Sequence, residues 1–366
     1  MNMNIKKRGN KYTYVIDIGT NGERKQKRIT KSTKDEVKAA VLEIMFQLNR
    51  GTYSEPSKMP FSELTAMWLE VRRYEIRETT LTTYRNVISR HLNPKFGDLP
   101  LSKFTPRMLI TFVNKMYDEG YSKNYVAKII VVLKMLFNYA IEEGFLNQNP
   151  ASKIKKQEEK NTVTDVWNQE EVNRFLALAK KSSPYYLAYL ISLTSGLRRG
   201  EVLGLSWDAV NFNNNTIFIM QVLTNDGKRL VSSTKTEKSK RSVVLPSNVM
   251  NELKIWKEKF DLKEKELGGN FKKYRLVVSS KAGSPVSPSN LRRNMGIIIE
   301  KAKVPKITFH CLRHTHATLL MEQGVHVKIV SERLGHSDIK TTMNRYTHVS
   351  QTMQEKAAKI IGNIIK

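Results

Sequence analysis

The sequence predicts a multi-domain α+β protein that is mainly helical. Its 366 residues, of which 40% are hydrophobic, are enough for two or three domains with real hydrophobic cores. Apolar residues alternate near the N-terminus as in a half-buried strand, recur at helical spacing from residue 61 to residue 144, and follow both patterns after residue 165. We therefore expect a small sheet with one helix, then a four-helix domain, then a mixed and mainly helical domain with a small antiparallel sheet.

Residues 1–56 predict the small sheet and its helix. Every second residue from Tyr12 to Ile18 is apolar, and Asn21-Gly22 is a typical hairpin turn before a second extended run at 24–30. From residue 32 to residue 49 the apolar side chains fall on one helical face. The segment is expected to fold as one small domain.

Residues 57–152 predict the four-helix domain. Pro106 suits the first turn of the third helix, and Ser122 is a typical N-cap residue for the fourth. The polar segment 153–165 has little apolar content, so it is expected to be an interdomain linker.

Residues 166–350 predict the mixed domain. Asn168 and Glu171 have the spacing of a capping box at the start of a helix, and a second, apolar helix ends near Gly196. Helices dominate again from Pro288 onward. Strands are expected at Thr216–Leu223, Arg229–Ser233 and Ser242–Leu245.

The chain is strongly basic, with a formal net charge of +28 and an isoelectric point near 9.9. Residues 1–60, 61–157 and 158–366 carry net charges of +7, +6 and +15. Since no segment holds the charge alone, we expect double-stranded DNA or another nucleic acid to contact the whole chain. In the first segment Lys25, Lys27 and Arg28 are candidate DNA contacts.

A membrane partner is not expected. We find no apolar run near the ~20 residues that a spanning helix needs, and no charged-then-apolar leader. The one cysteine, Cys311, excludes an intrachain disulfide and four-cysteine zinc modules. The expected location is the bacterial cytoplasm, in association with the nucleoid.

Short motifs follow one another along the last domain. They are Ser195–Glu201 (SGLRRGE), Thr234-Lys235-Thr236 ahead of Arg241, His310–His314 (HCLRH), Leu334-Gly335-His336, and Arg345–His348 (RYTH). In this order the set resembles the tyrosine recombinase family, the integrases of phages and mobile elements. The resemblance is close over roughly residues 160–350. Residues 57–152 and 1–56 more loosely resemble the core-site domain of the family and its three-stranded, arm-site DNA-binding domain.

The resemblance implies a site-specific recombinase that integrates and excises a mobile element through a 3′-phosphotyrosyl intermediate and a Holliday junction. Tyr346 is then the nucleophile, and its phosphodiester stores the bond energy, so that no ATP is needed. Arg198 and Arg313 would hold the scissile phosphate, because planar guanidinium groups bind phosphate oxygens bidentately. No metal or other cofactor is expected.

The resemblance also selects Lys235, beyond a predicted hairpin, as the proton donor to the leaving 5′-oxygen. Its neighbours Lys238, Lys240 and Arg241 are further candidate DNA contacts, and the whole cluster could instead be a phosphate-binding surface.

Two histidines and one glutamate complete the expected site. His310 and His336 would lie near the phosphate as proton carrier and hydrogen-bond donor, since imidazole titrates near neutral pH. Glu201 lies three residues after Arg198 on the same helical face, so we expect it to hold Arg198 in an ion pair.

A zinc site is the alternative interpretation of the cluster His310, Cys311, His314 and His316. Histidines four apart on a helix often bind zinc, but such sites usually place a catalytic glutamate between them. Here Arg313 occupies that interval and puts a positive charge where a cation would bind. We therefore expect no metal, and a structural or DNA-facing role for His314 and His316.

Residues 351–366 carry an apolar stripe at helical spacing, formed by Met353, Ala357, Ile360, Ile361 and Ile364. The resemblance suggests that this segment docks on a neighbouring protomer, within a homotetramer on two duplexes. A host DNA-bending protein and an excision factor are further partners that it suggests.

Two other functions fit parts of the sequence. A non-catalytic regulator would use residues Val325–Leu334 and Ile339–Met343 as a helix-turn-helix. A type IB topoisomerase uses a similar residue set. The regulator does not account for the ordered motifs, and strand exchange between two duplexes separates a recombinase from a topoisomerase.

Overall fold

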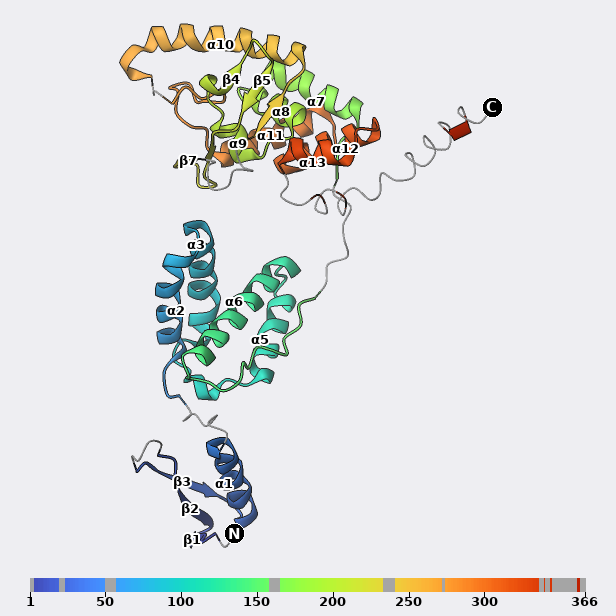
Figure 1. Ribbon diagram of the computed structural model, residues 1–366. Helices are drawn as coiled ribbons and strands as arrows, with labels where there is room; N and C mark the ends of the chain where they lie inside the picture. Colours follow the sequence, from blue (N-terminus) through green and yellow to red (C-terminus); the bar gives the residue numbers. More distant parts are fainter. Residues whose placement is uncertain are drawn as a thin grey trace. The chain divides into compact units, whose positions relative to one another are not determined.

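The computed structural model describes residues 3–19, 24–49, 57–157, 165–232, 241–271 and 274–335, together with residues 339, 343, 361 and 362 (Figure 1). The chain divides into two compact units, Met1–Thr162 and Val163–Lys366. The predicted fold class is confirmed: the described residues are mainly helical, with small antiparallel sheets.

The N-terminal sheet has three antiparallel strands in sequence order, β1 (Lys6–Arg8), β2 (Lys11–Asp17) and β3 (Gln26–Lys31). Helix α1 (Lys34–Asn49) packs on one face, where Val37 and Val41 meet Ile16 and Ile29. The register pairs Tyr14 with Ile29 and Val15 with Arg28. Because neighbouring residues of a strand point to opposite faces, Arg28 lies on the face that α1 leaves open.

The helical part of the first unit contains four helical rods. The second rod is continuous but changes from α-helix to π-helix and back, so that one turn is wider than its neighbours. The rods are α2 (Phe61–Glu75), the run α3–η1–α4 (Glu78–Val87, Ile88–Leu92 and Asn93–Phe96), α5 (Pro106–Asp118) and α6 (Lys123–Glu142), with a 3₁₀ turn η2 at Leu101–Lys103.

The predicted helix starts of this part are confirmed. Pro106 lies in the first turn of α5, where Thr105 Oγ1 accepts a hydrogen bond from the Met108 N–H at 3.3 Å. Ser122 Oγ accepts from the Tyr125 N–H at 3.3 Å and so caps α6. Both caps satisfy an N–H group that the helix itself leaves unpaired.

Two details of the helical part differ from the sequence predictions. Ile154, in the segment predicted as a linker, is buried in the helical core, because the chain beyond α6 folds back onto that core. Helix α6 is also a 20-residue helix with a mean hydropathy of 1.4, whereas no such run was expected. Half of the most apolar 18-residue stretch of this helix is buried, as in the core helix of a folded domain.

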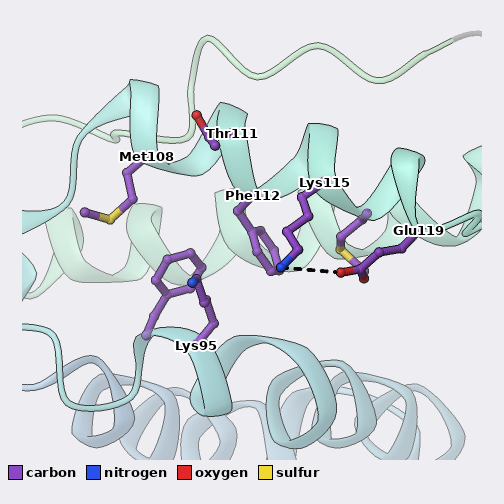
Figure 2. Close-up of a pocket in the computed structure, with 8 residues that line it drawn as sticks. Lys95, Met108, Thr111, Phe112, Lys115 and Glu119 are labelled. Carbon is purple, nitrogen blue, oxygen red and sulfur yellow. Dashed lines mark ion pairs between the residues drawn. The ribbon is translucent and has the colours of Figure 1, made fainter.

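A cavity of about 410 Å³ lies between α4 and α5 (Figure 2). Aromatic and thioether side chains, including Phe96, Phe112 and Met108, form half of its wall, and the Lys115–Glu119 ion pair of 3.7 Å is part of the other half. None of the predicted catalytic residues contributes to this cavity.

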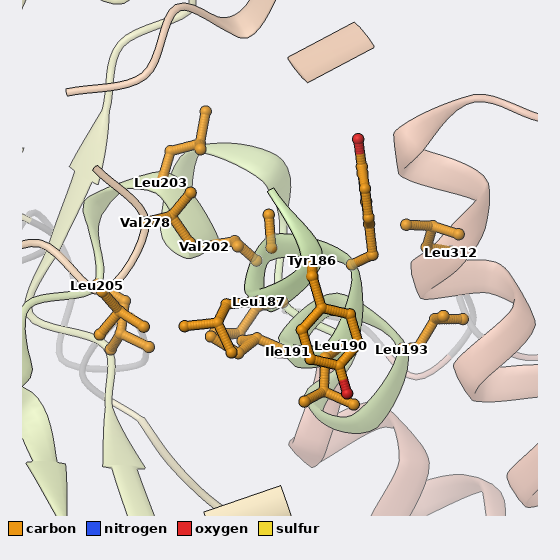
Figure 3. Close-up of a cluster of buried hydrophobic side chains, with 14 of the residues drawn as sticks. Tyr186, Leu187, Leu190, Ile191, Leu193, Val202, Leu203, Leu205, Val278 and Leu312 are labelled. Carbon is orange, nitrogen blue, oxygen red and sulfur yellow. The ribbon is translucent and has the colours of Figure 1, made fainter. Parts of the chain in front are cut away.

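The second unit is built around helix α8, which is apolar on all sides and buried along its length (Figure 3). A helix without a polar face belongs inside a core. Leu312 of α12 packs on one side of α8, and Val202 and Leu203 of α9 on another (Figure 3). The helices of the unit are α7 (Gln169–Ser182), α8 (Tyr186–Ser195), α9 (Arg199–Gly204), α10 (Ser247–Leu267), α11 (Pro288–Ala302), α12 (Phe309–Glu322) and α13 (Val327–Leu334), with 3₁₀ turns η3 at Trp207–Ala209 and η5 at Gly268–Asn270.

The capping box predicted for α7 is confirmed. Asn168 Oδ1 accepts from the Glu171 N–H and Glu171 Oε2 accepts from the Asn168 N–H, each at 2.9 Å. Next to this cap, Trp167 is buried and its indole N–H donates to the Pro305 carbonyl at 2.8 Å.

The described strands of the second unit form two small sheets rather than one. The run 216–223, predicted as one strand, is divided, because its first half bonds to one sheet and its second half to the other. The first sheet is β4 (Val210–Asn211), β5 (Thr216–Phe218) and β8 (Ser242–Val244), and the second is β6 (Gln221–Leu223) with β7 (Leu230–Ser232).

Strand β6 packs on helix α9 instead of extending the first sheet. A Cβ atom on Gly204 would lie 2.9 Å from the Gln221 carbonyl oxygen, and one on Gly200 would lie 2.8 Å from the Leu223 carbonyl oxygen. Glycine at both positions therefore lets the backbones of α9 and β6 touch without side chains between them.

Candidate active site

The structure describes part of the predicted site. Arg198, Glu201, Arg241, His310 and Arg313 are described, as are Lys25, Lys27 and Arg28. The predicted residues Lys235, Lys238, Lys240, His336 and Tyr346 lie outside the described residues, as does most of the C-terminal segment 351–366.

The site is organised by the short turn between α8 and α9, residues Gly196–Glu201, which we call the arginine turn. Helix α8 ends at Gly196 with φ at +69°, a left-handed conformation that favours glycine. Arg198 is the N-cap of α9, and its side chain is 45% exposed. A half-exposed guanidinium at the start of a helix suits the binding of an anion.

Glu201 is the buried acceptor of the arginine turn, with a side chain that is 7% exposed. It accepts from the Arg198 backbone N–H at 2.8 Å and from Arg198 Nη1 at 3.0 Å, which confirms the predicted ion pair. Arg241 adds two hydrogen bonds, from Nη1 at 3.1 Å and from Nη2 at 2.8 Å.

These contacts keep Glu201 ionised. Burial alone would raise the pKa of the carboxyl, but the hydrogen bonds and positive charges of Arg241 and Arg198 outweigh burial and hold the pKa below its usual value. A negative charge therefore stays fixed beneath the exposed guanidinium of Arg198.

Arg313 reaches the same turn from α12. Its guanidinium is buried, and Nη1 donates to the Gly196 carbonyl oxygen at 2.7 Å. A Cβ atom on Gly196 would lie 2.7 Å from His316 Cδ2 and from Leu334 Cδ2. Glycine thus serves both the left-handed turn and the close approach of α12 and α13.

His316, one turn beyond Arg313 on α12, is a neutral buried histidine. Its Nδ1 lies 2.8 Å from the Leu193 carbonyl oxygen and its Nε2 lies 3.2 Å from Arg333 Nε. Because arginine can only donate, Nε2 accepts and Nδ1 carries the proton. Burial, followed by the charge of Arg333, lowers the pKa of His316 to about 4.

The end of α13 closes the site. Arg333 Nη2 donates to the Thr194 and Val244 carbonyl oxygens, each at 2.9 Å. Beyond the helix, the Gly335 carbonyl oxygen accepts from Arg198 Nη2 at 3.2 Å. The turn, α12 and α13 therefore meet through hydrogen bonds from arginines.

The candidate DNA contacts lie in different surroundings. Arg241 was expected on a DNA-facing surface, but its side chain is 11% exposed and its donors face Glu201 and the Arg333 carbonyl oxygen. In the N-terminal sheet, Lys27 pairs with Ile16 on the face that α1 covers, whereas Arg28 is exposed on the open face. Lys25 is exposed just before β3.

The histidines on α12 differ in exposure. His310 is exposed at the start of the helix, while His314 and His316 are buried. The His310 and His314 rings meet edge to face at 4.7 Å between centroids. Both ring nitrogens of His316 have protein partners, which leaves it no lone pair for zinc. Within the described part of the chain, no three His, Cys, Asp or Glu side chains gather as a metal site would require.

Sequence reasoning missed Arg333, whereas the contacts of His316 agree with the structural role that was one of its two expected roles. Arg333 directly precedes the Leu334-Gly335-His336 motif, and His316 lies three residues after Arg313, so position relative to the motifs was the available signal. Neither position reveals a partner, because Arg333 binds residues 139 and 89 positions away in the sequence.

Comparison with protein families gives two matches. Residues 166–353 match the model of the phage integrase family, and residues 60–117 match the model described as the N-terminal SAM-like domain of phage integrases. The first match covers just over half of the chain and includes the whole candidate site.

Among curated proteins, a protein described as tyrosine recombinase XerC-like from Caldanaerobacter subterraneus subsp. tengcongensis is 28% identical over 385 residues, covering 99% of this chain and 98% of the relative. The ICEBs1 integrase of Bacillus subtilis is 26% identical over 373 residues, covering 99% of this chain and 100% of the relative.

Among solved structures, the integrase of transposon Tn1549 in complex with transposon right end DNA has a TM-score of 0.69 and 20% identity, covering 82% of this chain and 100% of that one. A lambda integrase tetramer bound to a Holliday junction has a TM-score of 0.60 and 18% identity, covering 93% and 94%. These likenesses establish the fold.

Proposed function

Because the chain belongs to the phage integrase family, we propose that it is the site-specific recombinase of a phage or integrative mobile element, with Tyr346 as its nucleophile. As a tyrosine recombinase it cleaves and rejoins DNA strands.

The observation that carries the proposal is the convergence of Arg198 and Arg313 on one turn. Arg313 Nη1 donates to the Gly196 carbonyl oxygen at 2.7 Å, and Arg198 follows Gly196 by two residues. Glu201 holds Arg198 through the 3.0 Å ion pair. Two guanidinium groups tied to one turn can bind the non-bridging oxygens of a single phosphate.

The reaction follows from these groups. The Tyr346 oxygen attacks the scissile phosphorus and forms a P–O bond, while the bond from phosphorus to the 5′-oxygen breaks. Arg198 and Arg313 stabilise the added charge on the non-bridging oxygens. His310 takes the proton that the Tyr346 phenol loses, Lys235 gives its proton to the leaving 5′-oxygen, and His336 donates a hydrogen bond nearby. Attack by the 5′-hydroxyl of a partner strand reverses these steps.

The remaining parts of the chain would bind DNA. The open face of the N-terminal sheet presents Lys6, Lys11 and Arg28, which are exposed, and so fits the backbone of an arm-type site. The helical part, residues 57–152, would bind the core site. A match to the SAM-like domain of phage integrases supports the second assignment.

The proposed assembly is a homotetramer on two duplexes, as in the lambda integrase tetramer bound to a Holliday junction. The apolar stripe of residues 351–366 would join neighbouring protomers. A host DNA-bending protein and an excision factor would act with it, in the bacterial cytoplasm.

A covalent-complex assay tests the proposal. A nicked duplex carrying the junction between the element's end and the adjoining chromosome is incubated with the protein in EDTA and run on a denaturing gel. We expect a protease-sensitive protein–DNA band with the wild type and none with Tyr346→Phe. Tyr274→Phe, which changes an exposed tyrosine of the same unit, is the matched control and should retain the band.

Three results would overturn the proposal. A band with Tyr346→Phe would assign the nucleophile to another residue. No band with the wild type, in spite of specific binding to the junction, would favour the non-catalytic DNA-binding regulator. Relaxation of one supercoiled duplex without exchange between two would favour the topoisomerase.

A further inference from the structure

Two partly buried arginines lie where the segments that carry the other catalytic candidates join the described structure. Residues 233–240, with Lys235, end directly before Arg241. The segment with His336 and Tyr346 begins directly after Gly335, two residues beyond Arg333. Both junctions contact the arginine turn, which carries Arg198.

Arg241 fixes the first junction. Its side chain is 11% exposed, and Nη1 and Nη2 both donate to Glu201, at 3.1 Å and 2.8 Å. The Arg241 carbonyl oxygen also accepts from the Ile219 N–H at 3.0 Å, which holds its backbone to the chain leaving β5. The residue that follows the Lys235 segment is thus held by side chain and by backbone.

Arg333 fixes the second junction. It donates from Nε to His316 Nε2 at 3.2 Å and from Nη2 to the Thr194 and Val244 carbonyl oxygens at 2.9 Å. Thr194 lies in the last turn of α8, two residues before the arginine turn. Burial lowers the pKa of Arg333, and the neutral state of His316 leaves Nε2 free to accept.

The two junctions also contact each other. Arg241 Nε donates to the Arg333 carbonyl oxygen at 3.3 Å. A Cβ atom on Gly335 would lie 2.6 Å from Arg241 Nη1, so the Gly335 backbone packs directly on that guanidinium. The Gly335 carbonyl oxygen in turn accepts from Arg198 Nη2 at 3.2 Å.

We propose that Arg241 and Arg333 are positioning residues of the recombinase, which anchor the segments carrying Lys235 and Tyr346 to the turn that carries Arg198. Neither arginine contacts DNA. The inference rests on the proposed function, since it assigns a task to arginines around that same site. Each arginine anchors one segment: Arg241 positions the segment of the proton donor Lys235, and Arg333 positions the segment of the nucleophile Tyr346.

Contact with DNA phosphate is the competing explanation for arginines in so basic a chain. An arginine can bind phosphate only through donors that are not already committed to protein acceptors. Nε, Nη1 and Nη2 of Arg241 and Nε and Nη2 of Arg333 donate to a buried carboxylate, a neutral imidazole and backbone carbonyl oxygens. To reach DNA, either side chain would have to abandon these partners and leave them buried without a donor.

The test compares two substrates in single-turnover cleavage by the full-length protein. One is the nicked junction duplex, and the other has sulfur in place of the bridging 5′-oxygen. Because a thiol has a pKa near 8.5, sulfur leaves without a proton, so the second substrate needs no proton donor. The variants are Arg241→Gln and Arg333→Gln, with Arg241→Lys and Arg333→Lys.

We expect Arg241→Gln to slow cleavage of the ordinary duplex about 100-fold, the usual contribution of a positioned proton donor. On the sulfur substrate it should act within about 3-fold of the wild type. Arg333→Gln should slow both substrates alike, because sulfur does not replace the nucleophile. Binding of the junction duplex should change less than about 3-fold for either variant, and the lysine variants should recover part of the rate.

Arg275→Gln is the matched control. Arg275 is another ion-paired arginine of the unit, and its partners are Glu264 at 2.6 Å, Asp208 at 3.4 Å and Asp261 at 3.8 Å. It should lower the thermal unfolding temperature without changing the ratio of the two cleavage rates. If a glutamine variant unfolds, its lysine variant carries the same comparison of substrates.

Three results would overturn the inference. Weaker DNA binding with a smaller salt dependence in either variant would mean phosphate contact. Equal loss on both substrates for Arg241→Gln would remove its link to the proton donor. Full activity of both variants would remove any positioning role and leave the proposed function intact. If the wild type itself forms no covalent complex, the proposed function fails, and this inference fails with it.

Discussion

Replacing Glu201 by glutamine should weaken the fold of the second unit more than its small change of shape suggests. The carboxylate accepts four hydrogen bonds, from the Arg198 N–H, Arg198 Nη1, Arg241 Nη1 and Arg241 Nη2. Glutamine has one oxygen and an NH₂ group that can only donate. One face of the side chain would then direct N–H groups at guanidinium N–H groups, with no negative charge between two arginines.

The magnitude follows from burial. Glu201 and Arg241 are 7% and 11% exposed, so this is a buried pair, and removing one partner of a buried pair costs about 3–5 kcal/mol. The Arg198 pair adds less than about 1 kcal/mol, because that guanidinium is 45% exposed and screened by water. We expect a loss of about 3 kcal/mol, or roughly 6–12 °C in Tm for a unit of this size.

The assay is thermal and urea unfolding of full-length wild type and Glu201→Gln, followed across pH. The folded-state pKa of Glu201 lies below 4.5, so its stabilisation is complete above pH 4.5 and is lost as pH falls through the folded-state pKa. The difference in unfolding free energy between wild type and Glu201→Gln should therefore become smaller as pH falls. The control is Glu252→Gln, since Glu252 pairs with the 55% exposed Lys180 and should cost below about 1 kcal/mol.

A Glu201→Gln protein within about 1 kcal/mol of the wild type, at neutral pH and with no pH dependence of the difference, would refute the reasoning. It would mean that the two arginines find other acceptors or water when the carboxylate is removed. A loss equal to that of Glu252→Gln would lead to the same conclusion.

Three further predictions follow. The pKa of His316 is about 4 in the folded chain and 6.5 in the unfolded chain, so the unfolded chain binds more protons between these two pH values. The free energy of unfolding should therefore fall by about 3 kcal/mol as pH drops from 6.5 to 4. His316→Gln should lack this pH dependence. Gly196→Ala, with φ at +69° and its new methyl 2.7 Å from Leu334, should cost at least about 2 kcal/mol in urea unfolding, and a near-neutral effect would contradict the described packing. Arg28→Gln should weaken arm-site binding and reduce the salt slope of binding by about one, whereas Lys38→Gln, exposed on α1, should leave both unchanged.

Local features of the fold were predictable from the sequence. The Asn168–Glu171 capping box, the Ser122 cap and the Arg198–Glu201 ion pair all join residues three positions apart, so their spacing alone implies contact. The apolar helix that ends at Gly196 could be identified for the same reason. Its burial at the centre of a unit follows from the absence of a polar face.

The partners of the buried arginines could not be predicted. Arg241 lies 40 residues from Glu201 in sequence, and in a basic stretch it has the same appearance as a DNA contact. The sequence also did not predict that residues 216–223 are divided between two sheets. It depends on the glycines of α9, which let β6 leave its neighbour. Such outcomes are set by tertiary contacts that no local pattern encodes.

The contacts around the arginine turn join residues that are far apart in sequence, so the candidate active site can form only late in synthesis of the chain. Thr194 must wait for Arg333, and Gly196 for Arg313, which are made 139 and 117 residues later. Domains made first can fold on the ribosome before the rest of the chain exists. A nascent chain can therefore hold a folded N-terminal sheet and helical core while its strand-cutting centre is still unmade. If residues 57–152 bind the core site as proposed, a chain that terminates before α13 would occupy that site without cleaving it and would compete with the full-length protein.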